Sequence, residues 1–393
     1  MTTNSKLSGL RGRRVQIAGS ASQSTDPQLV KFAHDLVSTV TTMILSEGGG
    51  LVLNVGKEPR PLGASPEAPS LIFDWTALEA AARCFRAGHS TWSHISGPPI
   101  QVVTSEKAAS EIPSERLSLW HELLDGGFVN VEYILPGARS ATMMRDRQVQ
   151  LGDILLLLGG GTGVEHSARL YMDRRYPVIP IDLPLGASRE DGTGGSMRLS
   201  LEARNDVSRF FSLQPEVAGT AGGRFAAIST RGGSEDVRSV ASRVIDLIEN
   251  LCPPTAFYVR LLNSSVSAVS RVEDFFRNVV DSVVEDAGFR HIEIGTDPTK
   301  EPFLNVAIFD NLHFASVAVI DLTDERPNCF IELGYALGRS IKVIMTAEEG
   351  STLPFDSHDI PCFFWKHGVD DKERRKALGE FWQKYVDRRP LVG

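Results

Sequence analysis

One run of aliphatic residues constrains the fold of this chain more than any other feature. Residues 154–158 read Ile-Leu-Leu-Leu-Leu, and residues 159–163 read Gly-Gly-Gly-Thr-Gly directly after them. A strand without alternation of polar and apolar side chains is buried on both faces, which is typical of parallel sheets covered by helices. A helical pattern begins near Val164 and completes a strand–turn–helix unit. The run therefore predicts an α/β protein with a parallel sheet.

Strand–helix units recur along the chain and fall into two groups, separated near the Pro253–Pro254 pair. Since 393 residues are too many for one ordinary core, we expect two domains. Both are expected to be open parallel-sheet domains of Rossmann-like or flavodoxin-like type, arranged in tandem. The expected division is a flexible N-terminus at residues 1–13, a first domain at 14–216, a linker with a helix at 217–254, and a second domain at 255–393.

Charge and composition argue against several classes of function. A net charge of −8 disfavours non-specific binding of nucleic acid, because a negative protein repels a phosphate backbone. The aliphatic run is too short to cross a bilayer, and the basic N-terminus lacks the apolar stretch of a signal peptide. We therefore expect a cytoplasmic protein with no membrane partner. The 4 cysteines and 9 histidines show no metal-ligand spacing, which predicts no bound metal.

The expected second domain carries two carboxylates around one loop. An apolar strand ends in Asp321, and a helix expected at residues 329–339 places Glu332 in its first turn. In open α/β sheets ligands bind at the carboxyl ends of the strands, so both carboxylates are expected to face one crevice. On spacing alone, helix capping and stabilisation of the helix dipole would be the better explanation of both acids.

A longer pattern favours function over capping. Asp321, the Pro-Asn pair at 327–328 and the Glu-Leu-Gly-Tyr-Ala motif at 332–336 resemble the nucleoside 2-deoxyribosyltransferase family and the related TIR-like domains. The resemblance spans roughly the last 140 residues. It implies that Glu332 is the nucleophile or anion stabiliser at the anomeric carbon and that Asp321 helps hold the sugar hydroxyls.

Four further polar residues complete the expected substrate site. Asp324 and Asn328 lie in the same loop and are expected to contact the substrate. In the resembling family the first loop usually contains glycine or proline, whereas Asn263 and Ser264 stand there in this chain. These two residues could bind a ribose or a phosphate, and capping of the next helix is an equally good explanation.

Cleavage of a ribosyl–base bond requires little more than one carboxylate. Breaking the C–N bond develops oxocarbenium character, which a carboxylate below the ring stabilises or captures covalently. Nicotinamide leaves NAD without protonation, whereas a purine needs a general acid that the sequence does not identify. This favours NAD as a substrate, and no cofactor is expected.

The expected first domain carries a glycine-rich corner where two strands end. Glycines allow backbone N–H groups to approach a phosphate at a helix N-terminus. With residues 48–56, this corner resembles the SLOG superfamily, which includes the LOG-like phosphoribohydrolases, over roughly residues 13–215. The residues expected to bind a nucleotide signal are Gly19, Ser20, Gly159, Gly160, Gly161, Thr162 and Glu165.

The match to the enzymes of that superfamily is incomplete. Their motif reads Pro-Gly-Gly-x-Gly-Thr-x-x-Glu, whereas here Leu158 replaces the proline and one spacer residue is missing. The resemblance therefore implies nucleotide binding rather than catalysis for the first domain. Glu165 matches the family's catalytic glutamate, so an active phosphoribohydrolase stays open as an alternative.

The two resemblances together imply a bacterial nucleotide-signal effector of the kind used in antiphage defence. A nucleotide bound to the first domain would activate an N-glycosidase in the second, and a homo-oligomer is expected. This pairing of domains is an analogy rather than a derivation from the residues. The alternatives are a non-catalytic nucleotide-binding regulator and a metabolic nucleoside deoxyribosyltransferase or phosphoribohydrolase.

Overall fold

A computed structural model shows that the chain forms two compact units. The first unit is Gly9–Cys252, and the second contains Pro253–Gly393. The structure describes residues 8–61, 68–88, 97–135, 137, 139–186, 195–213, 218–262, 267–293, 304–339, 341–353 and 360–386.

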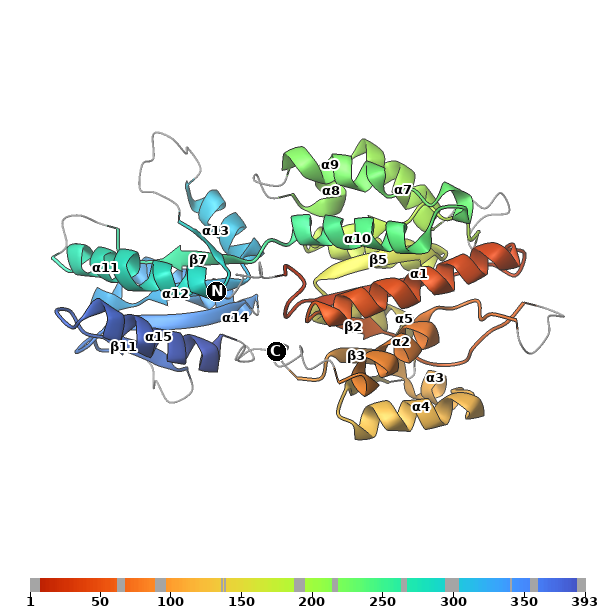
Figure 1. Cartoon of the computed structure of the whole chain (residues 1–393), viewed down its shortest axis with the longest axis horizontal. Coiled ribbons are helices and arrows are strands. Elements are labelled where there is room, and N and C mark those ends of the chain that lie inside the picture. The colour runs from red at the N-terminus through yellow and green to blue at the C-terminus, as the bar shows by residue number, and fades with distance from the viewer. Residues whose placement is uncertain are drawn as a thin grey trace. The chain divides into compact units, whose positions relative to one another are not determined.

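The first unit is built on a parallel sheet with the strand order β4-β3-β2-β1-β5-β6 in the described part of the chain (Figure 1). Every neighbouring pair in this sheet runs parallel. The order places β1 in the middle, next to both β2 and β5. The strands are β1 (Arg14–Ser20), β2 (Gly50–Leu53), β3 (Ile100–Ser105), β4 (Val129–Ile134), β5 (Ile154–Gly159) and β6 (Val178–Pro180).

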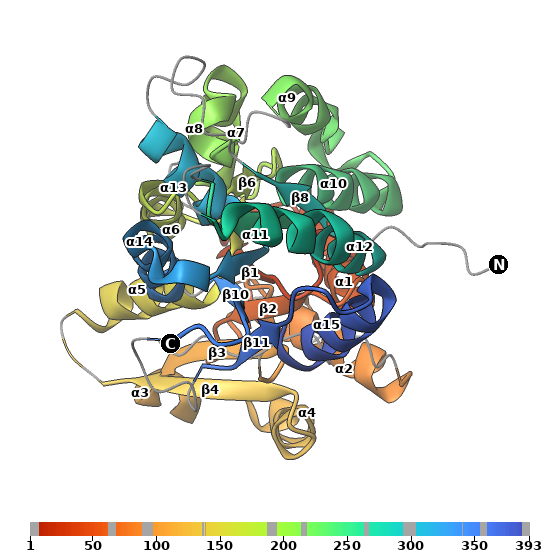
Figure 2. The same cartoon turned by 90° about the vertical axis from the view of Figure 1, so that its left-hand side faces the viewer.

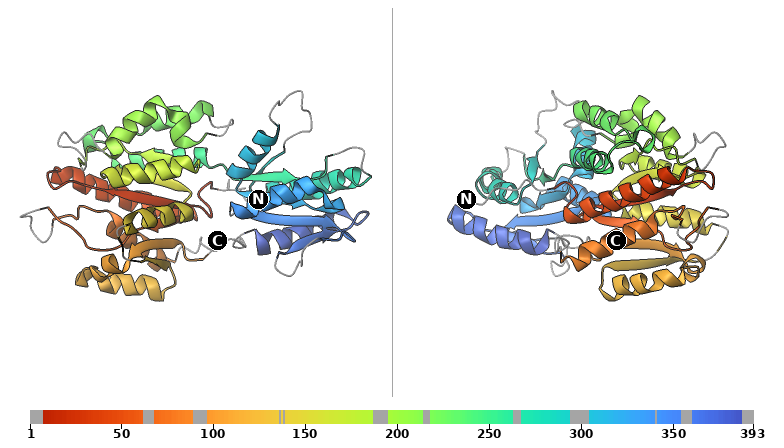
Figure 3. Two further views of the ribbon diagram at one scale, coloured as in Figure 1. Left: turned by 180° about the vertical axis from the view of Figure 1, so that it is seen from behind. Right: turned by 45° about the vertical axis from the view of Figure 1, so that its right-hand side comes forward.

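Helices cover both faces of this sheet. On one face α1 packs beside α2 and α10, and on the other α5 packs beside α6, which Figure 3 shows from behind. The helices are α1 (Pro27–Ser46), α2 (Asp74–Arg86), α3 (Glu106–Ser110), α4 (Ser114–Asp125), α5 (Ser140–Leu151), α6 (Thr162–Asp173), α7 (Ser196–Asn205), α8 (Val207–Phe211), α9 (Ala218–Ala227) and α10 (Val237–Leu251).

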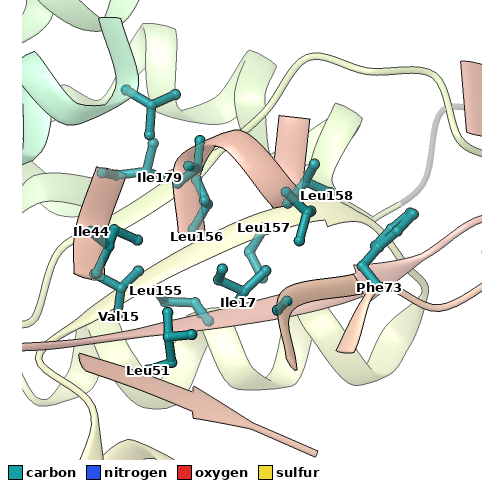
Figure 4. Close-up of a cluster of buried hydrophobic side chains, with 14 of the residues drawn as sticks. Val15, Ile17, Ile44, Leu51, Phe73, Leu155, Leu156, Leu157, Leu158 and Ile179 are labelled. Atoms are coloured by element: carbon teal, nitrogen blue, oxygen red, sulfur yellow. The ribbon is translucent and has the colours of Figure 1, made fainter. Parts of the chain in front are cut away.

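The aliphatic run at residues 154–158 forms the centre of the first core. Every residue of β5 is buried. Its leucines pack between β1 and the surrounding helices, as Figure 4 shows for Val15, Ile17 and Ile44. At roughly 25 cal/mol per Å² of buried apolar surface, a fully buried leucine contributes about 2 kcal/mol to folding. This strand therefore anchors the loops at its carboxyl end.

The second unit is a parallel sheet of order β11-β10-β9-β7-β8. One core cluster lies under α11, α12 and α15, and another under α13 and α14, on the two sides of the sheet in Figure 2. A π-helical turn, Phe276–Val280, joins α11 to α12. The elements are β7 (Thr255–Val259), α11 (Val269–Phe275), α12 (Asp281–Asp286), β8 (Arg290–Ile292), α13 (Leu304–Phe314), β9 (Val317–Asp321), α14 (Pro327–Gly338), β10 (Lys342–Glu348), β11 (Cys362–Trp365) and α15 (Asp371–Tyr385).

The predicted fold class is confirmed, since both units are α/β with all-parallel sheets. The predicted linker at 217–254 has a different character, because α10 packs against α1 and contributes buried residues to the first core. The sequence of an amphipathic helix does not show which domain it packs against. The place of α10 in the first core therefore becomes visible only in the structure. In the described ranges, every helix falls short of the length and apolar character that a membrane crossing requires.

Candidate functional site

The carboxyl ends of β1 and β5 meet in the first unit, where Ser20 pairs with Gly159. Gly160 donates its backbone N–H to the Ser20 carbonyl at 2.7 Å. Gly159 and Gly160 have φ values of 63° and 78°, in the left-handed region that favours glycine. A Cβ at Gly19 would lie 1.8 Å from the Leu158 carbonyl oxygen. The glycines therefore permit a close crossing of two backbones at this corner.

This corner leads into the N-terminus of α6. Gly161 occupies the N-cap position and no side chain caps the helix. Arg145 of α5 lies against the first turn, since a Cβ on Gly163 would be 2.8 Å from its Nη2. Among the described residues Arg145 forms no hydrogen bond or ion pair. Backbone N–H groups, the helix dipole and this guanidinium together make a corner suited to a phosphate.

Glu165 lies in the same helix but is held by protein partners. Its Oε1 accepts the Gly195 backbone N–H at 3.2 Å, and its Oε2 accepts Arg198 Nη2 at 3.2 Å. Gly195 has a φ of 60°, and a Cβ there would lie 2.0 Å from the Gly160 carbonyl oxygen. Glu165 therefore joins α6 to the start of α7 beside the phosphate corner.

Two residues that the sequence analysis did not single out lie at the same edge of the first sheet. Asp74 begins α2, and its Oδ1 accepts the Asn54 backbone N–H at 2.9 Å. Burial raises the pKa of Asp74 to about 6. Asn54 Oδ1 is buried and has no hydrogen-bond partner within the described residues. No motif marks either residue, because the contact joins the start of α2 to the residue after β2, 20 positions apart in the chain.

In the second unit Asp321 ends β9 as predicted, but its carboxylate is fully engaged. Oδ1 accepts the Thr323 backbone N–H at 3.0 Å, while Oδ2 accepts Thr346 Oγ1 at 2.7 Å and Trp365 Nε1 at 2.9 Å. Burial raises the pKa of this carboxyl, which is 1% exposed. We therefore assign Asp321 to the structure of the loop rather than to contact with sugar hydroxyls.

The loop between β9 and α14 exposes two other predicted residues. Asp324 is exposed, has a φ of 65° and lies 3.9 Å from Arg326 in an ion pair. Asn328 is exposed in the first turn of α14, directly after Pro327. Asn263 and Ser264 lie outside the described residues.

Glu332 stands in the second turn of α14, because the helix begins at Pro327 rather than at Cys329. Stabilisation by the helix dipole falls off after the first turn, so that explanation of Glu332 loses force. The carboxyl is half-buried, and desolvation raises its pKa to about 7. Among the described residues it forms no hydrogen bond or ion pair. A desolvated carboxyl without a protein partner is a candidate catalytic group.

Glu332 and Asp321 are brought to one corner by the fold. The negative charge of each raises the pKa of the buried Cys329 thiol, after the larger effect of its own burial. The Cys329 thiol is therefore within electrostatic range of both carboxylates. Within the described ranges, no cluster of three or more His, Cys, Asp or Glu side chains could hold a metal ion.

A polar group next to Glu332 was also missed by the sequence analysis. His313 of α13 approaches Tyr335 Oη with its Nδ1 at 3.2 Å, and its Nε2 lies 3.5 Å from Arg339 Nη2. The Tyr335 ring packs at 5.0 Å from the Phe309 ring. Tyr335 belongs to the Glu-Leu-Gly-Tyr-Ala motif, but its partners come from a separate helix. Only the packing of α13 on α14 reveals the group.

Comparison with known proteins gives a family match within the first unit and two relatives that carry the same enzyme name. A family model described as ATP nucleosidase Cap17-like, N-terminal, matches residues 10–248. Two Escherichia coli proteins named ATP nucleosidase Cap17, one from strain KTE188, are each 30% identical over 181 residues. The matched region covers 46% of this chain and 34% of each relative, so the chain spans about a third of their length.

Among solved structures, an α,α-trehalose-phosphate synthase (UDP-forming) from Burkholderia vietnamiensis aligns over 94% of this chain and 89% of its own. The TM-score is 0.21 and the identity 11%. A likeness this weak carries no inference about fold or function.

Proposed function

Because this chain belongs to the family described as ATP nucleosidase Cap17-like, N-terminal, we propose that it is a nucleotide N-glycosidase. The bond cleaved is the ribosyl–base bond of an adenine nucleotide, ATP or NAD. Catalysis takes place at Glu332 in the second unit, and a nucleotide bound to the first unit regulates it. We propose ATP as a substrate because the relatives are named ATP nucleosidase. We propose NAD because its nicotinamide group is cationic and leaves without protonation.

One observation carries the assignment to Glu332. It is a half-buried carboxyl with a pKa raised to about 7 and no partner among the described residues. A carboxylate in such surroundings stabilises the oxocarbenium charge at C1′ more strongly than one in water. The C1′–N bond breaks with its electron pair passing to the base, and the oxygen of water bonds to C1′ as that water gives up one proton. Adenine leaving ATP takes up a proton, whereas nicotinamide leaving NAD is already neutral and the proton passes to solvent. The products are adenine and ribose 5′-triphosphate from ATP, or nicotinamide and ADP-ribose from NAD.

The regulatory role of the first unit rests on its phosphate corner. Within the part of the chain that the structure describes, no side chain caps the α6 N-terminus and the Arg145 guanidinium has no hydrogen-bond or ion-pair partner, so the two together favour an anion. The glycines at the ends of β1 and β5 allow the two backbones to cross closely beside this corner. At the same sheet edge lie the Asp74 carboxylate and the buried Asn54 Oδ1, which has no partner among the described residues, and we propose them as acceptors for the hydroxyls or amino group of a nucleoside.

A second candidate is favoured by the position of the family match, which lies in the first unit. In this reading Glu165 cleaves the nucleotide, and the second unit has another role. Glu165 would first have to exchange its bonds to Gly195 and Arg198 for the substrate. We also propose a role in antiphage defence and activity as a homo-oligomer, both from the sequence resemblances. A non-catalytic nucleotide-binding regulator is the alternative to an enzyme.

The test is product analysis with matched variants. Purified protein is incubated with ATP, NAD, NADP and deoxyadenosine, with and without candidate nucleotide signals, and released bases are separated by chromatography. We expect base release by the wild type and its loss in Glu332→Gln. Loss in Glu165→Gln alone would move catalysis to the first unit. An intact panel under every signal would favour the non-catalytic regulator, and base exchange with added free base would favour a deoxyribosyltransferase.

A further inference from the structure

His313 has two polar neighbours, Tyr335 of α14 and Arg339 at the C-cap of that helix. A guanidinium has only hydrogen-bond donors, so the contact from Arg339 Nη2 makes His313 Nε2 an acceptor. A neutral imidazole that accepts at one nitrogen carries its proton on the other. In the neutral form of His313, Nδ1 therefore donates to Tyr335 Oη. The hydroxyl proton of Tyr335 remains available for a different acceptor.

Tyr335 follows Glu332 by one helical turn. Residues three apart on a helix are surface neighbours, with Cβ atoms about 5–6 Å apart. Arg339 lies one turn further along, so the three residues form one stripe on α14. Contacts from Tyr335 and Arg339 to His313 direct that stripe toward α13. In glycosidases the two catalytic groups flank the scissile bond at about 5–10 Å, a separation that side chains from adjacent turns of one helix can span.

We propose that Tyr335 is the general acid that protonates a departing purine. The inference rests on the proposed cleavage at Glu332 and supplies the group that a purine substrate requires. As the C1′–N9 bond breaks, its electron pair passes into the purine and the Tyr335 hydroxyl proton passes to a ring nitrogen. Water contributes its oxygen to C1′, and its released proton restores the tyrosine through solvent. His313 and Arg339 are positioning residues, because they act through the Tyr335 hydroxyl.

The test uses leaving groups that differ in their need for a proton. Adenine leaving ATP needs protonation, whereas nicotinamide leaving NAD does not. For Tyr335→Phe we expect the ratio of kcat for ATP to kcat for NAD to fall about 100-fold, the usual range for one general acid. A 7-methylated purine nucleotide, whose base leaves without protonation, replaces NAD if the wild type does not cleave NAD. Tyr385→Phe on α15 is the matched control, with an unchanged ratio.

The variants test general-acid catalysis by Tyr335 separately from cleavage at Glu332. Equal losses for both leaving groups would show that Tyr335 is structural, and an unchanged ratio would also overturn the proposal. Glu332→Gln should abolish both reactions; if it does not, the proposed function fails independently of Tyr335. A wild type that cleaves no purine nucleotide contradicts the inference. His313→Asn, which keeps the tyrosine, should lower the same ratio by a smaller factor and serves if Tyr335→Phe does not fold.

Discussion

Trp365 Nε1 donates to Asp321 Oδ2 at 2.9 Å, which ties β11 to the end of β9. Thr346 of β10 donates to the same oxygen. One buried carboxylate therefore joins three successive strands of the sheet at the edge where the loop to α14 begins. The position of that loop, and with it the start of the helix that carries Glu332, depends on this bond network.

Asp321→Ala should destabilise the second unit by about 3 kcal/mol, because it leaves buried Thr346 and Trp365 donors without an acceptor. Urea unfolding monitored by tryptophan fluorescence measures the loss. Asp324→Ala removes an exposed carboxylate from the same loop and should change stability by less than about 0.5 kcal/mol. Equal stabilities of the two variants would contradict an anchoring role for Asp321.

Base release should rise with pH through the range around pH 7. Glu332 stabilises the positive charge at C1′ only when ionised, and its pKa in the free protein is raised to about 7. A plot of kcat/KM against pH should therefore show an ascending limb with a midpoint near 7. A limb centred near 4.5, the ordinary value of a glutamate, would mean that the carboxyl is not desolvated.

The same carboxyl should lower stability at high pH. The folded-state pKa of Glu332 is raised above its unfolded value of 4.5, so the unfolded state loses its proton first as pH rises. The group weakens folding progressively from about pH 4.5 to pH 7, and the full effect persists above that range. Glu332→Gln should therefore have a higher Tm than the wild type at pH 8, and the difference should shrink at pH 4.5. A pH-independent difference would refute this linkage.

Arg145→Gln should weaken nucleotide binding to the first unit. The variant removes the guanidinium beside the N-terminus of α6, and a charge-assisted hydrogen bond contributes about 1.5–3 kcal/mol, or roughly tenfold or more in Kd. Calorimetric titration with ATP in a Glu332→Gln background avoids turnover. Arg238→Gln, on the exposed surface of α10, makes the same change in net charge and serves as the control. Equal affinities of both variants would place the phosphate elsewhere.

The sequence predicted those features that depend on neighbours along the chain. The apolar run of β5 and the glycines after it fixed the strand, its burial and the turn, and the aspartate at the end of β9 was correctly placed. Its partners could not be foreseen, since Thr346 and Trp365 arrive from later strands. The roles of Arg145 and His313 could not be foreseen either, because each residue reaches its site from a separate helix. Pattern analysis locates a carboxylate but does not show what surrounds it.

The first unit is one unbroken stretch of chain that ends at Cys252. A ribosome therefore delivers all of its strands before any strand of the second sheet emerges, and domains generally fold as units during synthesis. The nascent first unit can complete its core, and bind a nucleotide, while Glu332 is still untranslated. In each newly made molecule the proposed sensor thus exists before the glycosidase that it is proposed to regulate.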